Sequence, residues 1–209
     1  MSHIEPIANL DELAPELQSL LKLTESYMGF IPTSMLTMAH WPELLRQFNG
    51  LAATVLGQGI IDGGLKQLIA FVSSNAAGCR YCQAHTSHTA LRRGVTAEKI
   101  DAAFEFETSP LFNDAERAAL RIAAYGSILP NAVEASHVEA LKKHFNEREI
   151  VEIMSVISLF GYLNRWNDTL ATTLEAPPRQ FADRALQANG WQIGKHDAAN
   201  AKSREETTN

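Results

Sequence analysis

The two cysteines of the chain stand three residues apart, at Cys79 and Cys82, and His85 and His88 follow at the same spacing. On a helix, residues three apart lie close together on one surface, so the spacing predicts a row of two thiols and two imidazoles. A helix that begins near Gly78 places its unpaired amide groups and positive dipole end at Cys79, which lowers the pKa of a thiol. A fall from about 8.5 to about 6.5 makes the thiolate the majority form at neutral pH. Because a second thiol can capture the first after oxidation, the pattern predicts thiol redox chemistry.

Two other roles for these side chains fit the spacing less well. Buried cysteines often act as small hydrophobic residues, but that role would leave the C-x-x-C spacing and the histidine that follows it as a coincidence. A zinc site formed by the two cysteines and the two histidines would place four ligands along one face of one helix, where they cannot surround an ion tetrahedrally. We therefore expect no metal and no cofactor. His88 is kept as a supporting residue of the site, although it is more simply a partly exposed helix residue.

The size and charge of the chain exclude several classes of protein. Its 209 residues predict one domain. A net charge of −6, with a pI of about 5.6, leaves no basic field for a nucleic acid or an anionic membrane. No apolar run approaches the roughly 20 residues of a membrane span, and the first six residues lack the basic and apolar regions of a secretory signal. We expect a soluble cytoplasmic protein whose surroundings keep both cysteines as thiols.

Helices must position these residues, because the composition favours helix over strand. The sequence contains 29 Ala and 23 Leu against 7 Val. Apolar residues recur at intervals of three and four, which predicts about eight helices. One of them spans about 65–75 before the cysteines, the cysteine helix spans 79–93, and a long helix follows the capping-box residues Asn146 and Glu149.

The same pattern predicts how the chain is divided. We expect an N-terminal segment over 1–9 and a single all-α domain over 10–190. The composition beyond the last apolar helix becomes polar, which predicts a disordered tail over 191–209.

The sequence around the cysteines resembles a known family. The motif is Gly78-Cys79-Arg80-Tyr81-Cys82-Gln83-Ala84-His85. It follows a helix over 65–70 and precedes Leu91-Arg92-Arg93-Gly94-Val95. On these residues the chain resembles the AhpD-like alkylhydroperoxidase and carboxymuconolactone decarboxylase superfamily. The segments 29–32 and 160–168 resemble a longer, uncharacterised peroxidase-related branch, so the resemblance covers about residues 10–176.

The resemblance implies an all-α AhpD-like helical bundle with an N-terminal helical extension, assembled as a trimer or hexamer of identical chains. It also implies a thiol peroxidase or disulfide oxidoreductase acting on a hydroperoxide or a disulfide. The family assigns attack to the second cysteine, Cys82, and resolution to the first, Cys79, with His85 tuning the thiolate. A dithiol such as lipoamide or a thioredoxin-like protein then reduces the disulfide. The helix dipole alone favours Cys79 as the more reactive thiol, so the order of attack stays open.

Two positions depart from the family pattern. The family histidine stands four residues after the second cysteine, where this chain has Thr86, and His85 is rotated from that position by about 100°. The proton-relay glutamate of the family is replaced by Gln67, which cannot take a proton but can orient a water or the imidazole. A relay would then end at His85 or use another acid. Candidates for that acid are Glu105, Glu107 and Asp168.

These departures also favour a second class of function. A non-catalytic protein could keep the oligomeric scaffold and use the pocket near Cys82 to bind a small ligand or to assemble. An enzyme of the carboxymuconolactone decarboxylase type is a third alternative, less favoured because the cysteine pair would then be idle. Titration of the thiols separates the first two, since a pKa well below about 8 supports the enzyme.

Overall fold

The computed structural model describes residues 2–201, and within that range it contains helices and no strands. The α-helices are α1 (Pro15–Met28), α2 (Thr33–Met38), α3 (Pro42–Leu56), α4 (Gly63–Ala76), α5 (Arg80–Arg92), α6 (Ala97–Asp101), α7 (Asp114–Ser127), α8 (Ala135–Lys142), α9 (Glu147–Thr169) and α10 (Ala176–Ala185). The all-α prediction is confirmed, and two of these ten helices, α2 and α6, are only 6 and 5 residues long. None of the described helices is both long and apolar enough to cross a membrane.

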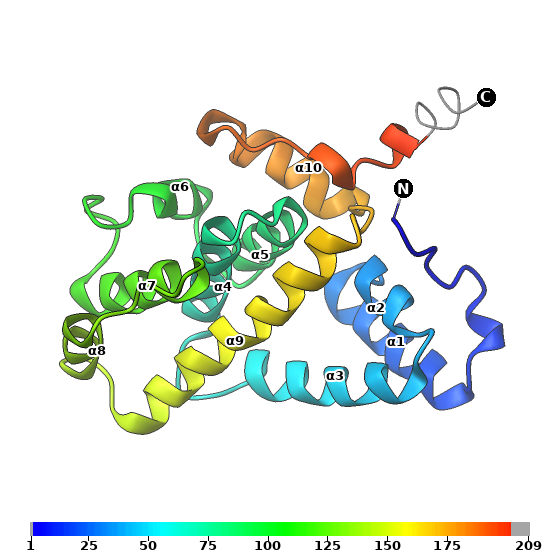
Figure 1. The fold of residues 1–209 in the computed structure, drawn as a ribbon, viewed down its shortest axis with the longest axis horizontal. Coiled ribbons are helices and arrows are strands. Elements are labelled where there is room, and N and C mark those ends of the chain that lie inside the picture. Colours follow the sequence, from blue (N-terminus) through cyan, green and yellow to red (C-terminus); the bar gives the residue numbers. More distant parts are fainter. Residues whose placement is uncertain (1, 202–209) are drawn as a thin grey trace.

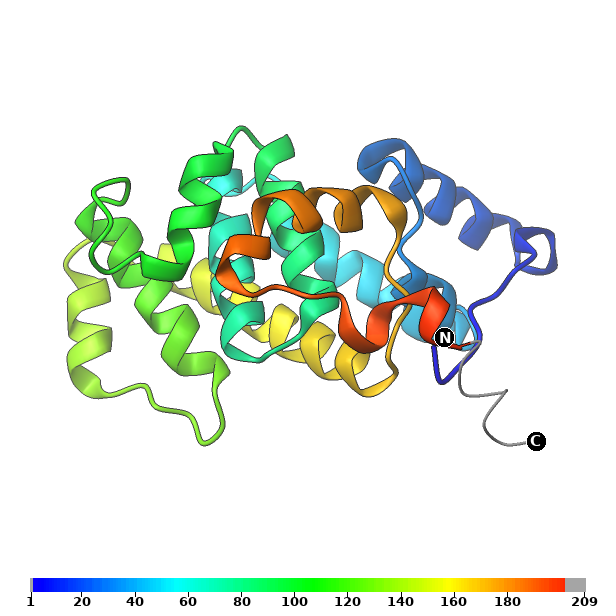
Figure 2. The same cartoon turned by 90° about the horizontal axis from the view of Figure 1, so that it is seen from above.

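Helix α4 lies at the centre of the main hydrophobic core. Its residues from Leu68 to Val72 are all buried, and it packs against α5, α7 and α9. Figure 1 shows α9 crossing the molecule diagonally, with α7 and α8 on one side and α1–α3 on the other. Helix α10 packs along α5, and Figure 2 shows it from above. The cysteine helix α5 is therefore enclosed by α4, α9 and α10.

The three N-terminal helices form a second, smaller core. Leu17 and Leu21 of α1 are buried in one cluster with Met38 of α2 and Leu45 of α3. Phe48 of α3 packs against this cluster and against the main core. The N-terminal helical extension is thus joined to the rest of the fold by apolar packing, which is the main source of helix stability in a folded chain.

Several helix starts follow the local sequence. Thr96 caps α6 and Asn113 caps α7, each with a side-chain oxygen that accepts a backbone N–H. Asn146 and Glu149 form the expected reciprocal capping box at α9. Pro177-Pro178 lies in the first turn of α10. Proline fits there because the first turn leaves its N–H groups unpaired in any case.

The expected polar, disordered tail over 191–209 is wrong in its first part. Trp191 is 2% exposed and its Nε1 donates to the carbonyl of Arg80 at 3.2 Å, at the start of the cysteine helix. His196 is buried as well. Burying the large indole ring of Trp191 stabilises a folded conformation of this segment, although most residues beside it in the sequence are polar. Residues 202–209 lie outside the described part of the chain.

Candidate functional site

Helix α5 begins at the first cysteine of the motif. Gly78 has a φ of +77°, a left-handed conformation that glycine adopts without steric cost, and it turns the chain out of α4. Cys79 is the N-cap residue, and its Sγ accepts a hydrogen bond from the amide of Cys82 at 3.3 Å. Both cysteines are free thiols. The predicted position of Cys79 at the positive end of the helix is confirmed.

Cys82 faces a cavity, whereas Cys79 is enclosed by protein. The exposed fractions are 2% and 0%, and Cys82 is the one of the two that lines the cavity. Burial, reinforced by the adjacent Cys79 sulfur, raises the pKa of the Cys82 thiol well above its usual value. A hydrogen bond from Asn167 Nδ2 to Cys82 Sγ, at 3.5 Å, opposes this rise only in part. Removal from water therefore disfavours the charged form of the Cys82 thiol.

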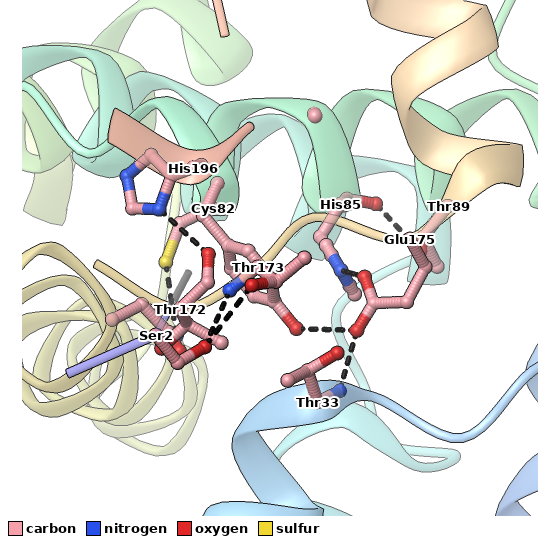
Figure 3. Close-up of polar contacts among 12 residues, drawn as sticks. Ser2, Thr33, Cys82, His85, Thr89, Thr172, Thr173, Glu175 and His196 are labelled. Carbon is pink, nitrogen blue, oxygen red and sulfur yellow. Dashed lines mark hydrogen bonds and ion pairs between the residues drawn. The ribbon is translucent and has the colours of Figure 1, made fainter. Parts of the chain in front are cut away.

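His85 pairs with a carboxylate that comes from the segment before α10. Its Nε2 lies 2.6 Å from Glu175 Oε2. The ring stacks on Tyr81, with centroids 4.3 Å apart, and meets the edge of Phe30 at 5.3 Å. Figure 3 shows the His85 ring directed toward Glu175, while the Cys82 sulfur points away from that pair. His85 thus makes no direct contact with the Cys82 sulfur in this structure, and the predicted tuning of the thiolate by His85 is not supported by such a contact.

Glu175 is held by groups from two other helices. Its Oε1 accepts hydrogen bonds from the Tyr81 hydroxyl, at 2.8 Å, and from the backbone amide of Thr33. Burial alone would raise the pKa of this carboxyl. The charge and hydrogen bond of His85, together with the Thr33 amide, outweigh burial and lower that pKa. Glu175 is therefore a buried carboxylate, ionised at neutral pH.

The structure brings one of the two supporting residues to the cavity. Gln67 of α4 is buried and lines the cavity together with Cys82 and His85. His88 does not line it, and its ring contacts those of Phe30 and Phe181 instead. Burial, with the nearby charges of His85 and Arg92, lowers the pKa of His88.

The acids proposed for a relay lie elsewhere. Glu107 pairs with Arg121, and Asp168 pairs with Lys195 at 2.8 Å. Glu105 is exposed. The carboxylate that reaches the imidazole is Glu175, which sequence reasoning missed, because it is separated from His85 by 90 residues. The available signal was weak, namely an acidic residue directly before the Ala176-Pro177-Pro178 helix start.

The cavity has a volume of about 600 Å³ and is mainly apolar. It lies between the N-terminal helices and the main core. Its apolar wall includes Leu20, Leu23, Met28, Met35, Phe48, Ala52, Leu56, Phe160 and Leu163. Its polar wall near the thiol includes Gln67, Tyr81, His85, Thr86 and Asn167. Cavities of this size with a few polar groups are typical of small-molecule sites. The sequence does not show where the first fifty residues lie relative to the site. In the structure their helices form one wall of the cavity and cover the site.

Solved structures resemble this chain over most of its length. The apo structure of the debrominase Bmp8 is 39% identical, covers 86% of this chain and 96% of its own, and has a TM-score of 0.80. A C82A variant of Bmp8 in complex with 2,3,4-tribromopyrrole is 38% identical, with coverages of 87% and 96% and a TM-score of 0.81. An uncharacterised peroxidase-related protein with an alkylhydroperoxidase AhpD core from Ralstonia eutropha JMP134 shares the fold at 22% identity, with coverages of 87% and 95% and a TM-score of 0.76.

The sequence comparisons agree with the structural ones. The uncharacterised protein YnjA of Escherichia coli strain K12 is 27% identical over 110 residues, which are 53% of this chain and 60% of that relative. The carboxymuconolactone decarboxylase family model matches residues 42–125. That range begins at α3, ends in α7 and contains both cysteines and His85. The chain therefore belongs to the same family as the debrominase Bmp8, and its residues 42–125 match the carboxymuconolactone decarboxylase family.

Proposed function

We propose that this protein is a dithiol reductase that removes a halogen from an apolar aromatic compound. Cys82 is the attacking sulfur and Cys79 the resolving sulfur. The similarity to the debrominase Bmp8, one of whose structures holds 2,3,4-tribromopyrrole, supports this substrate class. Two free thiols at the start of one helix also support it, because they are the arrangement from which the C-x-x-C pattern predicts redox chemistry.

One observation carries the proposal, which is the cavity of about 600 Å³ with Cys82 on its wall. A peroxide as small as hydrogen peroxide needs no such space, whereas a halogenated ring does. The mainly apolar wall supports binding of an apolar ring, because burying apolar surface gains about 25 cal/mol per Å². Cys79 lies at the start of the same helix, and its Sγ is 3.3 Å from the amide nitrogen of Cys82, which supports a disulfide between the two residues after oxidation.

The reaction balances with the two thiols as the only reductant. The Cys82 sulfur, after losing its proton, forms a bond with the halogen while the carbon–halogen bond breaks and the ring carbon takes a proton. Cys79 then attacks the Cys82 sulfur, and the halide leaves as the disulfide forms. Two thiols and one carbon–halogen bond become one disulfide, one carbon–hydrogen bond and one hydrogen halide. His85, with Glu175 as its partner, is the wall residue that can carry the proton.

A dithiol must then restore the thiols. We propose a lipoamide-type or thioredoxin-like donor for this step, since a dithiol reduces a protein disulfide through a mixed disulfide. We also propose that the chain works as a homo-oligomer, and light scattering on the purified protein tests this directly.

Reduction of an organic hydroperoxide is a second candidate, and the contact between His85 and Glu175 favours it. This pair supplies the carboxylate that Gln67 cannot provide. The same two thiols would convert a hydroperoxide into an alcohol and water while forming the same disulfide. The two candidates therefore share Cys79, Cys82 and His85 and differ in the bond that is broken.

The test is a single turnover without added reductant. The fully reduced protein is mixed under anaerobic conditions with 2,3,4-tribromopyrrole or, separately, with cumene hydroperoxide. Bromide, ring products and the alcohol are quantified, and mass spectrometry locates the crosslink. We expect one bromide released for each Cys79–Cys82 disulfide formed.

Two serine variants are the matched controls. Cys82→Ser should release no bromide, whereas Cys79→Ser should react once without forming the internal disulfide. Bromide release that persists in Cys82→Ser would refute the proposal. Alcohol formation without bromide would favour the peroxidase, and a bound but unchanged ring with two unreacted thiols would favour the non-catalytic binding protein.

A further inference from the structure

Asn167 of α9 uses only one half of its side-chain amide. Its Nδ2 donates to Cys82 Sγ at 3.5 Å. Its Oδ1 is buried and has no hydrogen-bond partner within the described residues. The side chain is 1% exposed and lines the cavity.

An unpaired buried carbonyl of this kind calls for an explanation, because most buried polar atoms in proteins have a partner and an unmade bond is costly. Phe160 and Leu163 of α9 also line the cavity, but they are apolar and offer no donor. On the polar wall, the hydroxyl of Tyr81 donates to Glu175 and that of Thr86 donates to the Cys82 carbonyl. The donor that completes this amide is therefore expected to come from the ligand.

We propose that Asn167 is a specificity residue that accepts a hydrogen bond from a ring N–H of the substrate, so that the cavity selects halogenated aromatic rings of the pyrrole type. This inference rests on the proposed function of the cavity as the substrate site. It goes beyond that function because it names the group that orients the ring.

The amide geometry explains why a donor is selected. Since Nδ2 is already directed to the Cys82 sulfur, the group left for the ligand is an acceptor only. A pyrrole-type N–H donates and does not accept, so it matches the Oδ1 acceptor, and the rest of the ring matches the apolar wall. The Nδ2 and Oδ1 atoms of Asn167 belong to one planar amide. A ring N–H bound to Oδ1 therefore lies near the Cys82 sulfur, and so does the carbon–halogen bond next to that N–H.

The experiment compares two ligands in a variant that cannot react. Cys82→Ser provides this background, and its hydroxyl can still accept from Asn167 Nδ2. Calorimetry measures the affinity for 2,3,4-tribromopyrrole and for its N-methyl derivative. We expect the N–H ring to bind about tenfold more tightly, which corresponds to about 1.4 kcal/mol, the order expected for one buried hydrogen bond.

Two substitutions on the same helix separate the hydrogen bond from the bulk of the methyl group. Asn167→Leu, added to the Cys82→Ser background, should reduce the preference to within about twofold. Asn164, one turn away, is also buried, and its side-chain amide has no hydrogen-bond partner in the part of the chain that the structure describes, but it does not line the cavity. Asn164→Leu should therefore keep the full preference, which makes it the matched control. Circular dichroism checks that both variants are folded.

Equal binding of the two rings in the Cys82→Ser protein would overturn the proposal without any substitution at position 167. A preference that survives Asn167→Leu would overturn it too, because the methyl group alone would then explain the difference. Bromide release in the single-turnover test without an N–H preference would refute this inference and leave the reductase intact. An N–H preference without bromide release would support Asn167 as a recognition residue and refute the reductase.

Discussion

Replacing Glu175 with glutamine is expected to loosen the contacts between α2, α5 and α10. The carboxylate is the N-cap residue of α10. It lies 2.6 Å from His85 Nε2 and accepts hydrogen bonds from the Tyr81 hydroxyl and the Thr33 amide. His85 and Tyr81 belong to α5, and Thr33 is the first residue of α2. One buried charge therefore joins three helices around the cavity.

The magnitude follows from these three contacts. A hydrogen bond to a charged group contributes about 1.5–3 kcal/mol and a neutral one about 1 kcal/mol. Glutamine keeps one oxygen as an acceptor but removes the charge, so each of the three contacts weakens by about 1 kcal/mol. Relief from burying a charge offsets part of this sum, which leaves a loss of about 2 kcal/mol in the free energy of unfolding. In a chain of this size that loss corresponds to a fall in Tm of about 4–8 °C.

Thermal unfolding followed by circular dichroism at several pH values tests this reasoning. The folded protein holds the pKa of Glu175 below its unfolded value of 4.5. The stabilisation is therefore complete above that pH and is lost as the pH falls through the folded pKa. The Tm difference between wild type and Glu175→Gln should be largest at pH 7 and shrink in acid. The exposed Glu105 provides the control, because Glu105→Gln should change the Tm by less than about 2 °C. Equal Tm values at pH 7, or a difference that does not narrow in acid, would refute the argument.

Three further outcomes are expected. Alkylation of Cys82 by iodoacetamide, measured by peptide mass spectrometry, should keep accelerating from pH 7 to about pH 9, because burial raises the pKa of this thiol above 9; a plateau near neutral pH would contradict it. Lys66→Met should lower the free energy of urea unfolding by about 3 kcal/mol, because it removes the cation 2.7 Å from the buried carboxylate of Glu152. Adding Glu152→Leu should restore part of that loss, and a still larger loss would argue against an ion-pair role. Ala52→Trp, which fills the cavity, should weaken binding of 2,3,4-tribromopyrrole by more than about tenfold, whereas Thr54→Trp on the exposed side of the same helix should not.

The sequence predicted the features that depend on neighbours along the chain. The capping-box residues Asn146 and Glu149 are three residues apart, so their types and spacing are a sufficient signal. The position of Cys79 at the start of α5 follows from Gly78 in the same way. Helical periodicity likewise predicts the all-α fold, because it reports which side of each segment is buried.

The missed features depend on residues that are distant in the sequence. Glu175 reaches His85 only because α10 packs along α5, and no local pattern reports that packing. The burial of Trp191 against the start of α5 has the same cause. The raised pKa of Cys82 has a similar cause. The helix dipole, on which the sequence prediction for Cys79 depends, is a local effect, whereas the loss of water around Cys82 is decided by the helices packed over it.

The burial of Cys82 also limits which substrates its sulfur can attack. Each unit by which the pKa of a thiol rises above the ambient pH cuts the thiolate fraction about tenfold, but it makes each thiolate about threefold more nucleophilic, since the Brønsted coefficient is about 0.4–0.5. The net loss is about threefold per unit. An apolar ring that buries roughly 100 Å² in the cavity gains about 2.5 kcal/mol, which is more than the loss caused by a rise of one unit. A small polar oxidant gains nothing comparable, so the same burial that opposes ionisation of Cys82 favours reaction with an apolar ring.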